Sequence, residues 1–142
     1  MATALTVSRT EYGVVVDTSA LVAMLLGEPE RDAFIALLVE AADPVISAAT
    51  LVEGSIVMRA KTGDDGVDDL DSLLAIAAVR CVAVDEEQAR AAREAYARFG
   101  KGVVPSGLNF GDCFSYALAR TMDRPLLYKG GDFSETDIAS AG

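Results

Sequence analysis

Short apolar runs alternate along the chain with longer segments in which apolar residues recur every three or four positions. The short runs predict strands at about residues 14–16, 44–47, 80–84 and 125–128. The longer segments predict helices over residues 18–26, 29–42, 47–60, 64–79, 86–99 and about 112–120. Strands that alternate with helices predict an α/β fold with three layers, a parallel sheet flanked by helices.

Residues at the ends of these segments agree with the predicted boundaries. Ser47 and Asp85 are typical N-caps, and Pro29 suits the first turn of a helix. Gly27 and Gly100 are typical of positions just after a helix. Residues 100–111 then form one long loop, and a loop of that length in a compact domain is often functional.

Four acidic residues lie where these elements begin or end. Asp17 follows the first strand, Glu53 lies in the third helix, Asp112 begins the last helix, and Asp132 follows the last strand. Ligands of parallel sheets gather at the carboxyl ends of the strands. Because carboxylate oxygens are the ligands that hard cations prefer, the four acids predict a site for Mg²⁺ or, in its place, Mn²⁺.

Three of these acids also have an ordinary structural interpretation. Asp17 can cap the helix that follows it, and Asp112 is favoured by the dipole of its own helix. Asp132 can be a simple turn residue. Taken singly, none of the three indicates a site.

Glu53 is harder to explain structurally. Ala49, Val52, Ile56 and Ala60 form an apolar stripe at helical spacing, and Glu53 falls on that stripe. A charge on a core-facing stripe needs a partner or a metal to offset its desolvation. The alternative is that Glu53 reaches water at the edge of the stripe or pairs with a neighbouring arginine.

Segments around these acids resemble PIN-domain ribonucleases and, within that family, the VapC toxins. They are residues 15–22, the isolated Glu53, residues 109–113 and residues 126–133. The resemblance runs in order from about residue 14 to residue 138, and the first and third segments together are specific. It implies a PIN-like fold for a single domain over residues 13–142, with residues 1–12 as an N-terminal extension.

The resemblance also implies roles for particular residues. Asp17, Glu53, Asp112 and Asp132 match the family's acidic quartet, and Ser19 matches a small hydroxyl residue near the first acid. Many relatives carry Thr or Ser just before the last acid, where this chain has glycine. Asp132 is therefore the least secure member of the quartet.

Composition narrows the chemistry further. The chain has 142 residues, of which 51% are hydrophobic, enough for one substantial core. It contains no histidine, which excludes His-dependent zinc sites, catalytic triads and metal-free ribonuclease designs. Cys81 and Cys113 are expected to be small core residues, and two cysteines are too few for a thiolate zinc site. Phosphodiester hydrolysis would then depend on a metal ion.

No apolar run is long enough to cross a bilayer, and residues 1–12 lack the apolar region of a secretory signal. We therefore expect a cytoplasmic protein that is not bound to a membrane.

The net charge of −10 argues against a general nucleic-acid coat protein. Basic residues nevertheless lie close in sequence to the acids and could form a local cationic rim for RNA; Lys101 and Lys129 are the strongest candidates, beside Arg59, Lys61 and Arg98. We expect the long loop of residues 100–111 to border the same substrate groove. The overall acidity also fits a protein held by a basic partner.

Three hypotheses follow. The first, which the resemblance implies, is a Mg²⁺-dependent endoribonuclease, the homodimeric toxin of a type II toxin–antitoxin pair that is silenced by a VapB-like antitoxin. The second is an aspartyl-phosphate enzyme or receiver that uses Asp17 and Lys129. It is weakened because Ser19 stands where such phosphatases carry a second Asp. The third is a non-catalytic module whose acids dock a basic protein.

Overall fold

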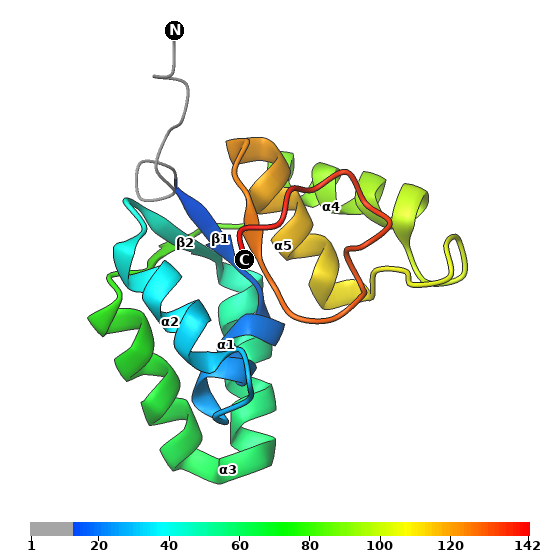
Figure 1. Ribbon diagram of the computed structural model, residues 1–142. Helices are drawn as coiled ribbons and strands as arrows, with labels where there is room; N and C mark the ends of the chain where they lie inside the picture. The colour runs from blue at the N-terminus through cyan, green and yellow to red at the C-terminus, as the bar shows by residue number, and fades with distance from the viewer. Residues whose placement is uncertain (1–12) are drawn as a thin grey trace, which may run out of the picture.

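Four short parallel strands form the centre of the structure, a computed structural model that describes residues 13–142 (Figure 1). The strands are β1 (Val14–Val16), β2 (Pro44–Ser47), β3 (Arg80–Val82) and β4 (Leu126–Leu127). The helices are α1 (Thr18–Leu25), α2 (Arg31–Glu40), α3 (Ala48–Ile76), α4 (Glu86–Phe99) and α5 (Phe110–Met122). The predicted N-terminal extension, residues 1–12, lies outside the described residues.

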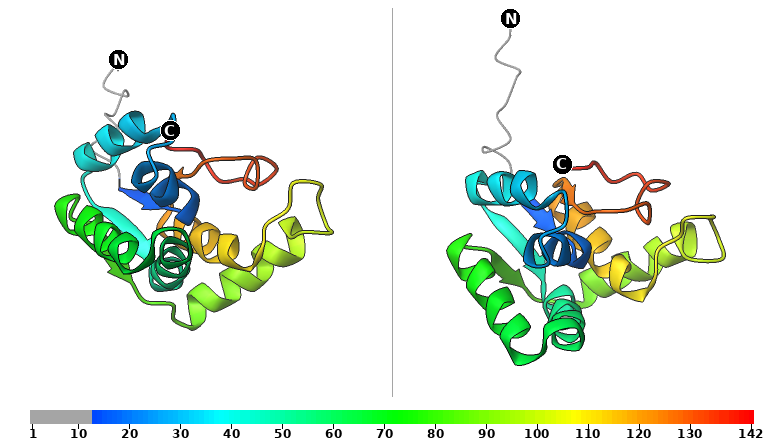
Figure 2. Two further views of the ribbon diagram at one scale, coloured as in Figure 1. Left: turned by 90° about the horizontal axis from the view of Figure 1, so that it is seen from below. Right: turned by 60° about the horizontal axis from the view of Figure 1, so that its bottom comes forward.

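The sheet has the order β3-β2-β1-β4, and every neighbouring pair is parallel. Parallel strands require crossover connections, which the helices supply. Helices α1, α2 and α3 cover one face of the sheet, and α4 and α5 cover the other (Figures 1 and 2). The predicted three-layer α/β fold is confirmed.

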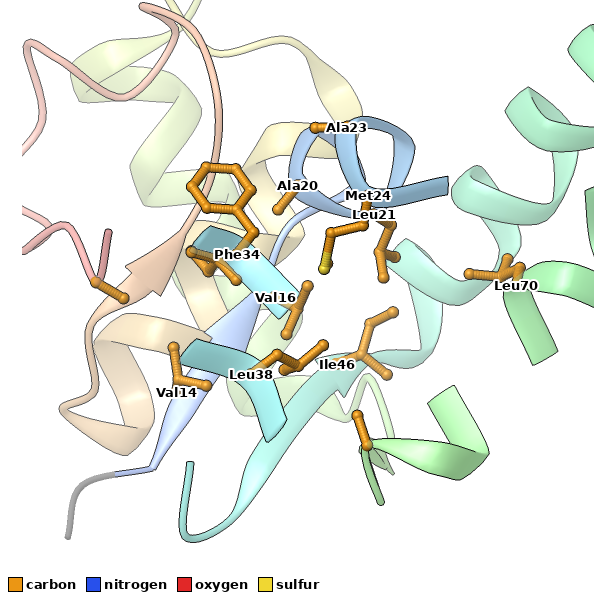
Figure 3. Packing of buried hydrophobic residues seen from close by; sticks show 13 residues of the cluster. Val14, Val16, Ala20, Leu21, Ala23, Met24, Phe34, Leu38, Ile46 and Leu70 are labelled. Carbon is orange, nitrogen blue, oxygen red and sulfur yellow. The ribbon is translucent and has the colours of Figure 1, made fainter. Parts of the chain in front are cut away.

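Alternate residues of β1 face opposite layers, which is why each layer has its own hydrophobic cluster. Val14 and Val16 pack with α1, α2 and α3, together with Phe34 and Leu38 of α2 (Figure 3). Val15 packs with α4 and α5 in the second cluster. Since β1 is buried on both sides, its sequence is a continuous β-branched run rather than an alternating one.

The long element α3 contains the two helices that the sequence predicted, joined at Gly63. Gly63 has φ 71° and ψ −154°, a conformation that L residues rarely adopt, and the chain doubles back there (Figures 1 and 2). The predicted helix starts and ends are otherwise close, although α2 begins at Arg31 rather than at Pro29.

Two burial predictions were wrong. The stripe on the first half of α3 is not core-facing: Val52 is 58% exposed and Ile56 is 64% exposed, while Thr50, Gly54 and Met58 form the buried face. Cys81 is exposed, because β3 lies at the edge of the sheet, whereas Cys113 is buried as expected.

Within the described residues, none of the helices combines the length and the apolar character that a membrane span requires.

Candidate functional site

The four predicted acids approach one another at the carboxyl edge of the sheet. Asp17 follows β1 directly, and Glu53 lies in the second turn of α3, the helix that β2 leads into. Asp112 lies in the first turn of α5, whose C-terminus leads into the start of β4. The N-terminus of α5 therefore lies at the same edge as the strand ends.

The Asp17 carboxylate is held by hydroxyl and backbone donors. Its Oδ2 accepts the Ser19 backbone N–H at 3.0 Å and the Ser19 hydroxyl at 2.7 Å, and Ser19 Oγ in turn accepts the Lys129 N–H at 3.0 Å. Its Oδ1 accepts the hydroxyl of Ser115 at 2.6 Å. Asp17 is the N-cap of α1, so the structural interpretation and the site interpretation both apply to it.

Glu53 contacts Thr18 and Gly111, which are next in sequence to Asp17 and Asp112. The Thr18 hydroxyl donates to Glu53 Oε1 at 2.5 Å. A methyl group added at Gly111 would lie 1.9 Å from Glu53 Oε2, so the carboxylate packs directly against the backbone of Gly111. Glu53 thus lies beside the residues that adjoin Asp17 and Asp112. The alternative pairing with an arginine is wrong for Arg59, which pairs with Asp64.

Asp112 has an unusual electrostatic environment for a first-turn acid. It forms a capping box with Asn109, in which each residue's side chain accepts the other's backbone N–H, at 3.0 and 2.8 Å. Burial raises the pKa of Asp112 to about 8, although the Asn109 N–H lowers it. A hydrogen bond with the Asp132 carboxyl and the charges of Asp17 and Asp132 contribute to the same rise. Like charges are therefore held close together here.

The donor set has the chemistry of a hard-cation site. Every functional group at its centre is a carboxylate or a hydroxyl, the oxygen ligands that Mg²⁺ and Mn²⁺ prefer. A cation would also offset the mutual repulsion that raises the pKa of Asp112. Among residues 13–142, however, no group of three or more acidic, cysteine or histidine side chains is already spaced for coordination. Binding would therefore draw these carboxylates closer together.

Several basic residues of the expected cationic rim are already paired with acids. The Lys129 ammonium group lies 2.8 Å from Glu28 and 3.1 Å from Glu30, so only its backbone N–H reaches the Asp17 group. Arg98 pairs with Asp137 at 4.0 Å. Lys61 and Lys101 are exposed and form no ion pair within the described part of the chain.

A groove of about 630 Å³ lies between α4 and α5, beside the cap of the Asp112 helix. Its lining is mainly apolar and aromatic: Ala89, Ala92, Arg93, Tyr96, Lys101, Asn109, Phe110, Cys113 and Phe114. Phe110, which packs edge-on against Phe114, is 79% exposed. The long loop borders this groove through Lys101 and Asn109.

Four polar residues around the acids were not predicted from the sequence: Thr18, Thr50, Asn109 and Ser115. Asn109 had a local signal, because an N-cap residue followed three positions later by an acid is a capping-box pattern. Ser115 could have been suspected as the one serine or threonine among the buried residues of α5. The partners of Thr18 and Thr50 depend on tertiary contacts that sequence spacing does not contain.

The chain is similar to known proteins over most of its length. The family model described as "PIN domain" matches residues 14–139. The chain is 49% identical over 127 residues to ribonuclease VapC30 of Mycobacterium tuberculosis, covering 89% of this chain and 97% of that protein. It is 48% identical over 129 residues to ribonuclease VapC of Mycolicibacterium smegmatis, covering 89% and 98% respectively.

Solved structures share the fold at much lower sequence identity. The crystal structure of Mycobacterium tuberculosis VapC20, described as a sarcin-ricin loop cleaving toxin, matches with a TM-score of 0.73 and 19% identity, over 89% of this chain and 96% of that one. A toxin-antitoxin complex from Klebsiella pneumoniae matches with a TM-score of 0.66 and 16% identity, over 91% and 98%. The expected resemblance is thus confirmed in sequence and in fold, and the chain belongs to the PIN-domain family, in its VapC group.

Proposed function

We propose that this protein is a Mg²⁺-dependent endoribonuclease that hydrolyses RNA phosphodiester bonds at the carboxyl edge of its sheet. The observation that carries the proposal is the convergence of Asp17, Glu53, Asp112 and Asp132 from four segments of the chain. Burial and neighbouring charge raise the pKa of Asp112, as expected where anionic groups are gathered for a cation. The relatives named as ribonucleases support the same reaction.

Each acid has a proposed role. Asp17 and Asp112 bind the cation directly, Glu53 binds it or orients the attacking water, and Asp132 completes the ligand set. Ser19 supports Asp17 through two hydrogen bonds to Oδ2. A bound Mg²⁺ supplies Lewis-acid polarisation of the phosphodiester and lowers the pKa of a water molecule. Mn²⁺ has similar ligand preferences and can replace it.

The decisive experiment is cleavage of total bacterial RNA by the purified, antitoxin-free protein. We expect discrete fragments with Mg²⁺, and no fragments with chelator or with Asp112→Asn. Glu40→Gln is a matched control, because Glu40 ends α2 and is exposed. Cleavage that persists in chelator would contradict the metal-dependent reaction, and folded, metal-loaded protein that cuts no RNA would favour the non-catalytic binding module.

We also propose that the protein is the toxin of a type II pair and is inhibited by a VapB-like antitoxin. A structural relative solved as a toxin-antitoxin complex supports this partner. The net charge of −10 suits a basic antitoxin segment. An RNA substrate fits the cytoplasmic location that we propose.

Exposed apolar side chains support a homodimer. Val52 and Ile56 lie on α3 on either side of Glu53 in sequence, and Phe110 begins α5 beside the groove. Val52 and Ile56 are one helical turn apart on α3, and adjoining exposed apolar residues often mark a protein–protein interface. We propose that a second copy covers this surface and that RNA reaches the acids from the open carboxyl edge.

The aspartyl-phosphate hypothesis has less support. That chemistry needs a lysine near the acid, and the ammonium group of Lys129 is engaged by Glu28 and Glu30. Labelling by a small phosphodonor that Asp17→Asn abolishes would revive it.

A further inference from the structure

Two buried hydroxyl groups lie behind the carboxylate of Asp17. Ser115 of α5 is 0% exposed and Thr50 of α3 is 1% exposed, and Asp17 itself is 2% exposed. Ser115 Oγ lies 2.6 Å from Asp17 Oδ1, and Thr50 Oγ1 lies 3.2 Å from Ser115 Oγ. The three side chains therefore link α3, α5 and the end of β1.

The direction of these hydrogen bonds follows from proton counting. An ionised carboxylate only accepts, so Ser115 must donate its single hydroxyl proton to Asp17. Ser115 then has no second proton, and the Thr50 hydroxyl is the donor in the contact between the two. The result is an ordered chain from Thr50 through Ser115 to Asp17.

The two oxygens of Asp17 are not equivalent. A carboxylate has about four acceptor sites, two on each oxygen. Oδ2 accepts two hydrogen bonds from Ser19, which fills its sites. Oδ1 accepts only the Ser115 hydroxyl within the described residues and keeps capacity for one more ligand. The oxygen that Ser115 holds is thus the one able to bind a cation.

Ser115 departs from the behaviour of other hydroxyl residues in these helices. Helical serine and threonine commonly donate to the carbonyl four residues earlier. Ser55, Thr62 and Thr121 do so here, at 2.8, 3.2 and 2.9 Å. Ser115 forms no such bond in the part of the chain described, although Gly111, four residues earlier, belongs to the same helix. Thr50 has no helical carbonyl four residues earlier, because α3 begins at Ala48. Simple satisfaction of the buried Ser115 hydroxyl would therefore not require it to point at an acid.

We propose that Ser115 is a positioning residue for the metal-binding oxygen of Asp17, and that Thr50 orients Ser115. Neither residue contacts the cation or the RNA. Ser115 fixes the rotation of the carboxylate, and as a neutral donor it leaves the negative charge of Asp17 available to a cation. The inference rests on the proposed function, since it assumes that Asp17 binds a divalent ion.

The test is calorimetric titration of metal-free protein with Mn²⁺ alone, in the absence of RNA. We expect Ser115→Ala to weaken Mn²⁺ binding by about 10- to 100-fold, as is usual when a residue that orients a metal ligand is removed. Thr50→Val keeps the side-chain volume but removes the donor, and it should weaken binding less, in the same direction. Thr50→Ser keeps the hydroxyl and should bind Mn²⁺ with the affinity of the wild type.

Thr121→Val is the matched control, because it removes a hydroxyl from the same helix without touching an acid. It should leave Mn²⁺ affinity unchanged. Thermal unfolding of each metal-free variant checks that the fold persists, and the Thr50 pair remains informative if Ser115→Ala does not fold.

Wild-type Mn²⁺ affinity in folded Ser115→Ala and Thr50→Val would overturn the inference. So would equal losses in Thr50→Val and Thr50→Ser, because packing and not the hydroxyl would then be responsible. If the wild-type protein itself binds no Mn²⁺ and cuts no RNA, the proposed function fails first. If the wild-type protein binds Mn²⁺ and cuts RNA, and the Ser115 and Thr50 variants bind Mn²⁺ equally well, only the proposed role of these two residues is refuted.

Discussion

Asp112 combines a structural and an electrostatic role in one side chain. Its carboxylate caps α5 through the Asn109 N–H, and its pKa is raised to about 8 by burial and by the neighbouring acids. Asn at this position keeps an oxygen that can accept the same N–H, but it carries no charge. The two roles can therefore be separated by a single substitution.

We expect Asp112→Asn to abolish cleavage while leaving the metal-free protein as stable as the wild type, or more stable. The raised pKa means that the folded state binds the Asp112 proton more tightly than the unfolded state does. This contribution to stability is fully present below the ordinary carboxyl pKa and is lost as the pH rises toward about 8. Melting temperatures of metal-free protein should therefore fall between pH 5 and pH 9 more steeply in the wild type than in Asp112→Asn. A large drop in the variant's melting temperature at all pH values would instead mark Asp112 as a structural cap.

Gly111 is a second residue whose size matters. Its missing side chain makes room for the Glu53 carboxylate, and an added methyl would lie 1.9 Å from Oε2. Because the end of a glutamate side chain can move, Gly111→Ala should fold with stability within about 1 kcal/mol of the wild type. Displacement of Glu53 should nevertheless reduce cleavage by about 100-fold, as small misplacements in active sites do.

Gly54→Ala is the control for that substitution. Gly54 lies next to Glu53 in α3, but a methyl there would make only ordinary contacts, 3.6 Å from Leu70 and 3.7 Å from Leu21. Helix propensity predicts a gain of about 1 kcal/mol and unchanged cleavage. Equal activity of the two alanine variants in an RNA cleavage assay would refute the packing argument for Gly111.

The segment after β4 carries Asp132 without belonging to a helix or strand, and it is held by contacts from α5. The Tyr116 hydroxyl donates to Asp137 at 2.5 Å, and Arg120 lies 3.6 Å from the same carboxylate. Burial and then Asp137 raise the pKa of Tyr116 to about 12, although Arg120 and Arg98 lower it, so this donor stays protonated at physiological pH. Asp132 therefore depends on an anchor five residues away.

Tyr116→Phe should loosen this segment. Loss of a hydrogen bond to a charged acceptor costs about 1–3 kcal/mol, and we expect a lower melting temperature with a smaller, less than tenfold, loss of cleavage. Tyr128→Phe is the control, because the Tyr128 ring packs on Phe133 and its hydroxyl forms no hydrogen bond within residues 13–142. An unchanged melting temperature in Tyr116→Phe would show that the anchor is unnecessary.

Sequence patterns predicted the elements well where local signals are strong. The continuous run of β1, the caps at Ser47 and Asp85 and the glycine after α4 are all local features, and each is confirmed. The buried face of α3 was misassigned because Val52 and Ile56 look like core residues in isolation. Apolar periodicity alone cannot distinguish a core from a surface that another chain could cover.

The acids were singled out because Asp17 and Asp132 follow strands, Glu53 falls on an apolar stripe and Asp112 begins an apolar helix. In the structure Asp112 lies near Asp17 and Asp132, and Glu53 contacts Thr18 and Gly111 beside them. Their roles as metal ligands remain proposals. The hydroxyl partners of these acids were missed, because Ser115 and Asp17 are 98 residues apart and only the parallel sheet brings them together. Lys129 was expected to face RNA, but its ammonium group forms ion pairs with two glutamates on the α1–α2 connection.

At the scale of the whole molecule, the exposed apolar surface predicts the oligomeric state. We expect Phe110→Ser to shift the protein from dimer to monomer in size-exclusion chromatography with light scattering. Phe110 is 79% exposed beside the groove, so the substitution would remove the proposed intermolecular contacts at little cost to the core. Ile76→Ser is the control. Ile76 is equally exposed, at 79%, but it is the last residue of α3 and does not line the groove. A dimer that survives Phe110→Ser would place the interface elsewhere.

The pairing of β1 with β4 has a consequence for when the protein can act. These strands are neighbours in the sheet but far apart in sequence, and their contact brings Lys129 to Ser19 and the segment of Asp132 to Asp17. Closing so long a loop is entropically costly and slow compared with forming local helices. Partly folded chains, in which α1, α2 and α3 have formed but β4 has not docked, therefore lack a complete set of acids. Under the proposed role of these acids, the protein is inert until its folding is finished, so the folding reaction itself delays the appearance of nuclease activity.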